Sequence, residues 1–268
     1  IMGDTGGDAD TSYGFHIDGS AAGPFLFENN TIDAGESISG TWGIKLFQNT
    51  SGPRTITLRD NTITAGEAGN ATDGYDTAYG LQADSDEDTL VLENNTFQTG
   101  TIGNQWLVRT KSPVSATITG NTFAGQTTVG GQTNLLWVFS QPQSVTVSGN
   151  IFELAGAGDG MGNVDDSRGF LGNVSTSTTN ISSNTFRTVT SDGAVYSMIE
   201  LRNQLSGGSA TVSNNILEAS VGGGESKAFN ILDASPVITN NVVVRRNGGT
   251  DSFRALHVRA GSPSGITT

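Results

Sequence analysis

Charged, amide and aromatic side chains recur in short segments of one form, aromatic-Gly-apolar-polar-apolar, as in Tyr13-Gly14-Phe15-His16-Ile17. Read as strands, these segments place alternate side chains on one outward face. Exposed aromatic rings beside charged groups suit sugar binding, because a flat ring can stack on a sugar ring. We therefore expect a carbohydrate-binding face, unless the loop 155–168 covers its aromatic residues. The candidate ligand-binding residues are His16, Lys45, Gln82, Arg109, Trp137, Phe139, Glu200 and Arg202.

Calcium is the one metal that the residue pattern suggests. Asp84, Asp86, Glu87 and Asp88 cluster in one expected turn, and carboxylate oxygens in flexible loops suit this ion. The spacing matches neither the EF-hand nor the Gly-Gly-x-Gly-x-Asp repeat, so a solvated acidic turn is the alternative. Asp84, Asp86 and Asp88 are the candidate calcium ligands, and no other cofactor is expected.

The two histidines of the chain, His16 and His257, lie in the first and the ninth copy of this segment. Eight steps of one strand spacing separate them by roughly 38 Å. They cannot form a two-histidine metal site, and neither belongs to a Ser-His-Asp arrangement. The sequence therefore predicts no catalytic residue of these kinds.

The segments belong to a longer repeat. After each one comes an alternating apolar strand, a polar corner that ends in Asn, and a second short strand, as in 90–97. Successive corner asparagines are separated by 26 to 34 residues, and the intervening sequence contains short strands and no helix, which is a solenoid pattern. The corner residues are Asn30, Asn61, Asn95, Asn121, Asn150, Asn184, Asn215 and Asn241.

This repeat predicts an all-β parallel β-helix of about eight full three-strand coils, which forms one domain over residues 1–268. Alternation points one set of apolar side chains inward, where neighbouring coils bury them. We expect each corner asparagine to adopt the left-handed conformation and its amide to bond the next asparagine along the axis. The chain begins and ends in mid-coil, so we expect a segment of a longer protein or ends that associate with other copies.

The pattern Tyr-Gly-apolar-x-apolar, followed by apolar-x-apolar-x-Asn-Asn-Thr-Ile and Ala-Gly, resembles right-handed parallel β-helix repeat proteins of the pectate-lyase-like superfamily. The resemblance covers essentially the whole chain and implies that the outer face of the first sheet forms a carbohydrate cleft. The catalytic motifs of that superfamily are absent. The pair Arg245-Arg246 lies at the end of a short strand, and Asp165-Asp166 is an isolated pair in a loop.

We therefore expect a secreted or cell-surface scaffold of the adhesion type that binds carbohydrate on this face and is not an enzyme. The alternatives are a polysaccharide lyase or glycoside hydrolase that uses the same face, and a structural segment of a filament or surface layer. The expected partner is a polysaccharide or cell-surface glycan.

The composition of the chain excludes some classes of binding partner. The formal charge is −13 and three lysines occur, so nucleic acid is excluded as a partner. No apolar run is long enough to span a bilayer, and the chain contains no cysteine. We expect an extracellular or cell-surface location.

Hydroxyl side chains form a second outward pattern, on the strands that end at the asparagine corners. Thr57, Thr117, Thr146 and Thr211 belong to it, whereas Glu28, Arg59 and Glu93 interrupt it in the first copies. Such a row can order water, as in ice-binding solenoids, although Thr is also simply a good strand residue.

Overall fold

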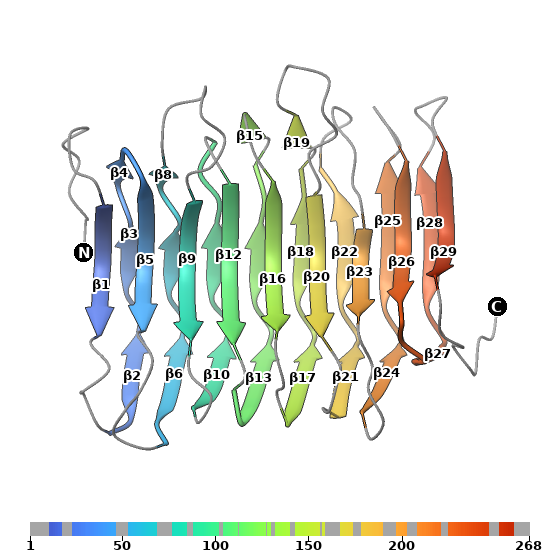
Figure 1. Ribbon diagram of the computed structural model, residues 1–268, viewed down its shortest axis with the longest axis horizontal. Helices are drawn as coiled ribbons and strands as arrows, with labels where there is room; N and C mark the ends of the chain where they lie inside the picture. The colour runs from blue at the N-terminus through green and yellow to red at the C-terminus, as the bar shows by residue number, and fades with distance from the viewer. Residues whose placement is uncertain are drawn as a thin grey trace.

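The protein is an all-β parallel solenoid in which three parallel sheets run along one long axis (Figure 1). The computed structural model describes residues 11–17, 23–46, 53–68, 77–84, 88–101, 104–111, 113–126, 128–129, 132–139, 143–155, 157–158, 167–173, 178–189, 197–202, 208–220, 225–246 and 252–259. Within them there is no helix, and hence none that could cross a membrane.

Sheet 1 is the nine-stranded sheet that carries the aromatic-Gly segments. Its strands are, in spatial order, β1 (Thr11–Ile17), β5 (Gly40–Leu46), β9 (Thr77–Asp84), β12 (Asn104–Lys111), β16 (Thr133–Phe139), β20 (Ser167–Asn173), β23 (Ser197–Arg202), β26 (Ser226–Leu232) and β29 (Phe253–Arg259). Spatial order equals sequence order, so each turn of the chain lies beside the previous one.

Sheets 2 and 3 contain eight strands each and meet at the asparagine corners. Sheet 2 contains β2 (Phe25–Glu28), β6 (Thr55–Arg59), β10 (Thr89–Glu93), β13 (Ser115–Thr119), β17 (Ser144–Ser148), β21 (Thr178–Ser182), β24 (Ser209–Ser213) and β27 (Val237–Thr239). Sheet 3 contains β3 (Thr31–Asp33), β7 (Thr62–Thr64), β11 (Thr96–Gln98), β14 (Thr122–Ala124), β18 (Ile151–Leu154), β22 (Thr185–Thr188), β25 (Ile216–Ser220) and β28 (Val242–Arg246). Two short pairs complete the fold: β4 (Glu36–Ser37) with β8 (Glu67–Ala68), and β15 (Thr128–Val129) with β19 (Ala157–Gly158).

The core is a column of inward side chains from all three sheets. Equivalent residues lie in register from strand to strand, as in Phe97↔Phe123 and Phe123↔Phe152. These rings and that of Phe186 stack with centroid separations of 5.3, 4.7 and 4.4 Å. The alternation therefore predicted the inward face of sheets 2 and 3 correctly, whereas strands of sheet 1 such as β5 depart from it.

The corner asparagines are joined by side-chain hydrogen bonds along the axis. Asn61 Nδ2 donates to Asn95 Oδ1 at 2.9 Å, and the backbone N–H of Asn61 donates to the same oxygen at 3.0 Å. The same two bonds recur from Asn95 to Asn121, and equivalent bonds link the corner residues between Asn30 and Asn241. Each interior amide thereby satisfies backbone groups at a buried bend.

The conformation predicted for these asparagines was wrong by one residue. The left-handed backbone belongs to the residue before each of them, with φ of 57° at Asn29, 68° at Gly120 and 58° at Ser183. Asx residues and glycine tolerate this region best, which explains the Asn-Asn, Asp-Asn and Gly-Asn pairs at the corners. The second residue is extended and is free to turn its amide toward its neighbours.

Candidate functional site

Strands β5, β9 and β12 of sheet 1 do not alternate strictly, because each has two consecutive buried residues between two half-buried ones. The first of the two is Gly43 in β5 and Gly80 in β9, and Leu107 in β12. A Cβ on Gly43 would lie 2.6 Å from the carbonyl oxygen of Gly80 and 2.7 Å from Ile63 Cγ2, so only glycine fits there. Gly43 and Ile44 are both buried, whereas Trp42 and Lys45 on either side are half-buried. Aromatic and polar positions three residues apart therefore share the outer face.

Two rows result, each in register across the sheet. Both are half-buried or exposed from β1 to β12, whereas residues such as Asn134, Leu171 and Glu200 further along the rows are buried. The first row begins with Tyr13, Trp42, Tyr79 and Trp106 and continues with Asn134, Arg168 and Ser197. The second row contains His16, Lys45, Gln82, Arg109, Trp137, Leu171, Glu200, Asn230 and His257. His16 lies on β1 and His257 on β29, so the two histidines lie on the two edge strands, as predicted.

The part of this face from β1 to β16 carries two groups of aromatic rings, one on β1, β5 and β9 and the other on β12 and β16. Tyr13 and Trp42 lie 5.0 Å apart and Trp42 and Tyr79 5.7 Å apart, with interplanar angles of 18° and 12°. Trp106 contacts Trp137 at 4.5 Å, and Trp137 stacks on Phe139 at 4.4 Å. All are half-buried, so ring edges reach the surface while ring faces contact one another.

Two cations lie over these rings. Lys45 Nζ is 4.1 Å from the Trp42 ring centroid. The Arg109 guanidinium carbon is 4.8 Å from the Phe139 ring and 5.4 Å from the Trp137 ring. Cation–π contacts of this kind hold a positive charge on the surface in a fixed position. The face therefore presents ordered cations and not merely solvated ones.

Six of the eight predicted ligand-binding residues meet in this region, namely His16, Lys45, Gln82, Arg109, Trp137 and Phe139. The prediction missed Tyr13, Trp42, Tyr79 and Trp106, which form the first row. The signal was present in the sequence, because an aromatic residue directly precedes the glycine in the first three copies. Strict alternation hid it by assigning aromatic and polar positions to opposite faces.

The other two candidates, Glu200 and Arg202, lie in a separate polar cluster toward β29. Glu200 is fully buried, and its Oε2 accepts hydrogen bonds from Ser197 Oγ and Asn230 Nδ2, both at 2.9 Å. Arg202 pairs with Glu200 Oε1, and His257 Nδ1 lies 2.8 Å from Asn230 Oδ1. Glu200 therefore organises its neighbours and does not face a ligand directly.

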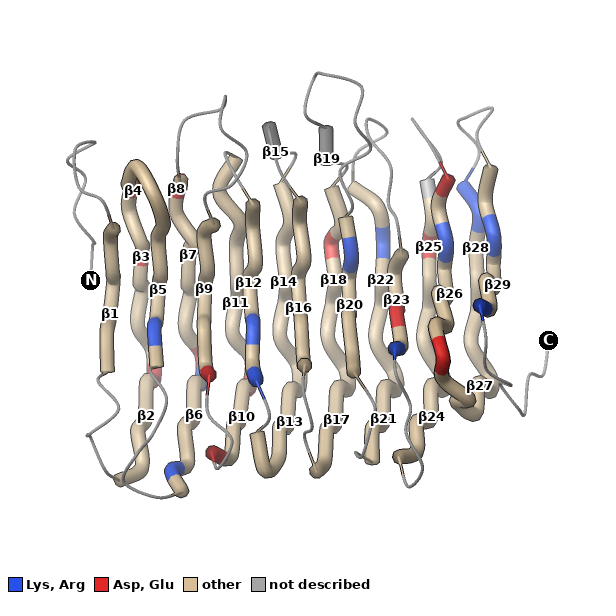
Figure 2. Tube along the Cα trace, in the orientation of Figure 1, with Lys and Arg blue, Asp and Glu red and all other residues tan. Residues whose placement is uncertain are grey.

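The strands of sheet 1 carry more basic than acidic residues, although charged residues also lie on the other sheets (Figure 2). Its strands carry only two carboxylates, Asp84 and Glu200, out of 26 in the chain. They carry eight of the 13 Lys and Arg residues, namely Lys45, Arg109, Lys111, Arg168, Arg202, Lys227, Arg254 and Arg259. Five of these cations have carboxylate partners: Arg109 pairs with Asp84, Arg168 and Arg202 pair with Glu200, and Lys227 and Arg254 pair with Glu225, just before β26. Lys45 and Arg109 are the cations that lie over the aromatic rings.

The two carboxylates of sheet 1 are too far apart to act together on one glycosidic bond. Asp84 is on β9 and Glu200 on β23, four strands along in the sheet order. Four spacings of about 4.8 Å place them roughly 19 Å apart, beyond the 5–10 Å that glycoside hydrolysis requires. Within the strands of this sheet, no carboxylate pair suits that reaction.

The candidate calcium ligands have other partners. Asp88 is buried and accepts hydrogen bonds from Arg54 Nη2 at 2.6 Å and from Arg54 Nε at 3.1 Å. Asp84 Oδ2 accepts a bond from Gln82 Nε2 at 2.5 Å and lies 3.7 Å from Arg109 Nη2. Asp86 and the pair Asp165-Asp166 lie outside the described residues. Among the described residues, no three His, Cys, Asp or Glu side chains form a group that could hold a metal.

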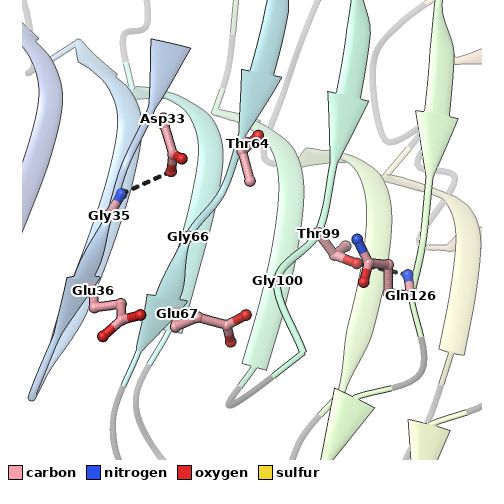
Figure 3. A pocket seen from close by; sticks show the side chains of 9 residues that line it. All are labelled: Asp33, Gly35, Glu36, Thr64, Gly66, Glu67, Thr99, Gly100 and Gln126. Atoms are coloured by element: carbon pink, nitrogen blue, oxygen red, sulfur yellow. Dashed lines mark hydrogen bonds between the residues drawn. The ribbon is translucent and has the colours of Figure 1, made fainter. Parts of the chain in front are cut away.

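A hollow of about 240 Å³ lies away from this face, beside β4 and β8 (Figure 3). Asp33, Glu36 and Glu67 make its lining acidic, and Asp33 Oδ1 accepts a bond from the Gly35 N–H at 3.0 Å. Glu67 is held by the N–H of Thr101 at 2.9 Å. The hollow is thus opposite in charge to the face of sheet 1.

The fold and the charged aromatic face together define a parallel β-solenoid with one chemically distinct side. No family model, curated protein or solved structure matches this chain.

Proposed function

We propose that this chain is a secreted or cell-surface solenoid scaffold that binds anionic polysaccharide along the outer face of sheet 1. The observation that carries the proposal is that Lys45 and Arg109 are held over aromatic rings on that face. The strands of the sheet carry eight of the chain's 13 basic residues, although Asp84, Glu200 and Glu225 pair with five of them. Carboxylate or sulfate groups of a glycan would meet these cations, and neutral groups could bond Gln82.

The arrangement of the aromatic rings suggests that the rings and the cations have different roles in binding. Because Tyr13, Trp42 and Tyr79 stack nearly parallel to one another, their faces are filled and their edges face outward. Sugar rings would therefore find little open aromatic face between them. Charge-assisted hydrogen bonds from Lys45 and Arg109 should supply most of the affinity, while the rings keep these cations in position.

We further infer a right-handed helix of about eight coils, related to the pectate-lyase-like superfamily, in which the corner asparagines act as a continuous ladder. The in-register amide bonds from Asn30 to Asn241 and the Ala-Gly turns support this architecture. A glycan-binding role fits an extracellular or cell-surface location, and end-to-end association would extend the same face.

The test compares binding of polygalacturonate and of a neutral glucan by isothermal titration calorimetry. The double variant Lys45→Gln, Arg109→Gln removes two cations from the face. We expect polygalacturonate affinity to fall by roughly a hundredfold, since each charged hydrogen bond contributes about 1.5–3 kcal/mol and 1.4 kcal/mol is a factor of ten. The control Arg187→Gln removes an exposed cation from sheet 3.

Equal affinity for the two glycans, or equal loss in Arg187→Gln, would refute the proposal. Release of unsaturated products from the bound uronate would instead identify a lyase, and binding without product would exclude that activity for this polymer.

A further inference from the structure

The outer face of sheet 2 changes character along the solenoid. On β6 and β10 it carries an ion pair, Arg59 with Glu93, whose Nη2 and Oε2 atoms lie 2.9 Å apart. From β13 to β24, each outward position of every strand is Ser or Thr, with the single exception of Asn180. The inward positions between them are buried.

These hydroxyls form a regular two-dimensional array. The strands pair in register without a bulge, as in Thr117↔Thr146 and Thr119↔Ser148. Neighbouring hydroxyls therefore repeat at about 4.8 Å across the strands and at roughly 6.7 Å along them. Regularly placed hydroxyl groups can each hold a water molecule by a hydrogen bond, so the array can order water in two dimensions.

The array is uncharged, and its outward residues are half-buried or exposed. In Figure 2 these four strands carry neither blue nor red segments. Within the described part of the chain, the hydroxyls of Thr117, Thr146 and Thr211 bond no other residue. In a chain of charge −13, this face is suited to a neutral partner.

We infer that this hydroxyl face binds ice. Charged groups hold hydration shells of their own, whereas evenly spaced uncharged hydroxyl groups can hold water in a regular array. A crystalline polysaccharide would be the other neutral partner, but its sugar rings are usually met by aromatic side chains. The outward positions of β13, β17, β21 and β24 contain no aromatic residue, which favours ice.

The test measures thermal hysteresis and inhibition of ice recrystallisation by the 268-residue chain. Thr146→Lys places a charge in the middle of the array. We expect this variant to lose most of the thermal hysteresis and most of the inhibition of recrystallisation. The matched control is Gln98→Lys, at a half-buried outward position of sheet 3. It should retain both effects, and circular dichroism with a melting curve should show that both variants stay folded.

Absence of both effects in the unaltered chain would overturn the inference, as would equal activity of Thr146→Lys. Should the chain instead bind crystalline cellulose and lose that binding on Thr146→Lys, the face would be assigned to sugar. The glycan face of sheet 1 is untouched by these changes, so the two proposals fail separately.

Discussion

At the scale of single residues, the buried asparagine amides and the left-handed corner residues stabilise the packing of each turn on the next. Asn121 is fully buried, and its Nδ2 donates to Leu92 O at 2.9 Å and to Asn150 Oδ1 at 3.0 Å. Its own Oδ1 accepts two bonds from Asn95. Its removal would leave buried groups on both neighbouring turns without partners.

We therefore expect Asn121→Ala to lower the free energy of unfolding by about 3 kcal/mol, because each unsatisfied buried polar group costs about 1–3 kcal/mol. Asn30→Ala, at the half-exposed start of the row, should cost clearly less. Urea denaturation measures both. An equal loss of unfolding free energy in the two variants would contradict the larger contribution that we assign to the buried interior amides.

The left-handed corners offer a second prediction. Gly149 has φ of 65°, and an added Cβ would find open space there, so Gly149→Ala isolates the conformational cost. We expect it to destabilise the protein by about 1–2 kcal/mol. Ser183→Gly, at φ of 58°, should act in the opposite direction. Denaturation midpoints that shift in the same direction for both variants would contradict the conformational cost assigned to the left-handed backbone.

At the scale of elements, a buried ion pair fixes the connections that lead into sheet 2. The Arg54 and Asp88 side chains are 0% and 5% exposed, and Arg54 Nη2 lies 2.6 Å from Asp88 Oδ2. The pair links the residues just before β6 to those just before β10. Breaking such a pair leaves an uncompensated buried charge.

We expect Asp88→Ala to cost about 3–5 kcal/mol of stability, and Arg54→Leu in the same chain to recover part of that loss. A chelator should leave the melting temperature of the unaltered chain unchanged, since Asp88 is engaged by arginine. A fall in Tm when the chelator is added would support a bound calcium ion at this turn.

Much of the arrangement of the strands was predictable from the sequence. The repeat predicted the parallel solenoid and its three sheets but not the short pairs β4–β8 and β15–β19, and alternation placed residues such as Leu92 and Phe97 in the core. The two-row face was not predictable, because two consecutive residues turn inward in the middle of these strands and break the period of two, with either Gly43 or Leu107 at the first position. The burial of Glu200 was also missed, because it depends on partners such as Asn230 that lie a full turn away in the sequence.

At the scale of the whole molecule, stability should vary along the axis as in a one-dimensional array. Interior strands contact two neighbours, whereas β1 and β29 each pair with one strand in the sheet order. The side chains of β29 are half-buried or exposed along its whole length. We expect hydrogen exchange to be slowest in β12 and β16 and fastest in β1 and β29. Uniform protection from end to end would contradict this expectation.

The central claim is that sheet 1 binds anionic glycan through its ordered cations. All three tryptophans of the chain, Trp42, Trp106 and Trp137, lie on its outer face, so tryptophan fluorescence reports this face alone. The decisive measurement is a fluorescence titration with an oligogalacturonate at low and at high salt. We predict a saturable change whose affinity falls steeply as salt rises, and no change with a neutral gluco-oligosaccharide. A flat titration at low salt, or one that is insensitive to salt, would contradict the account.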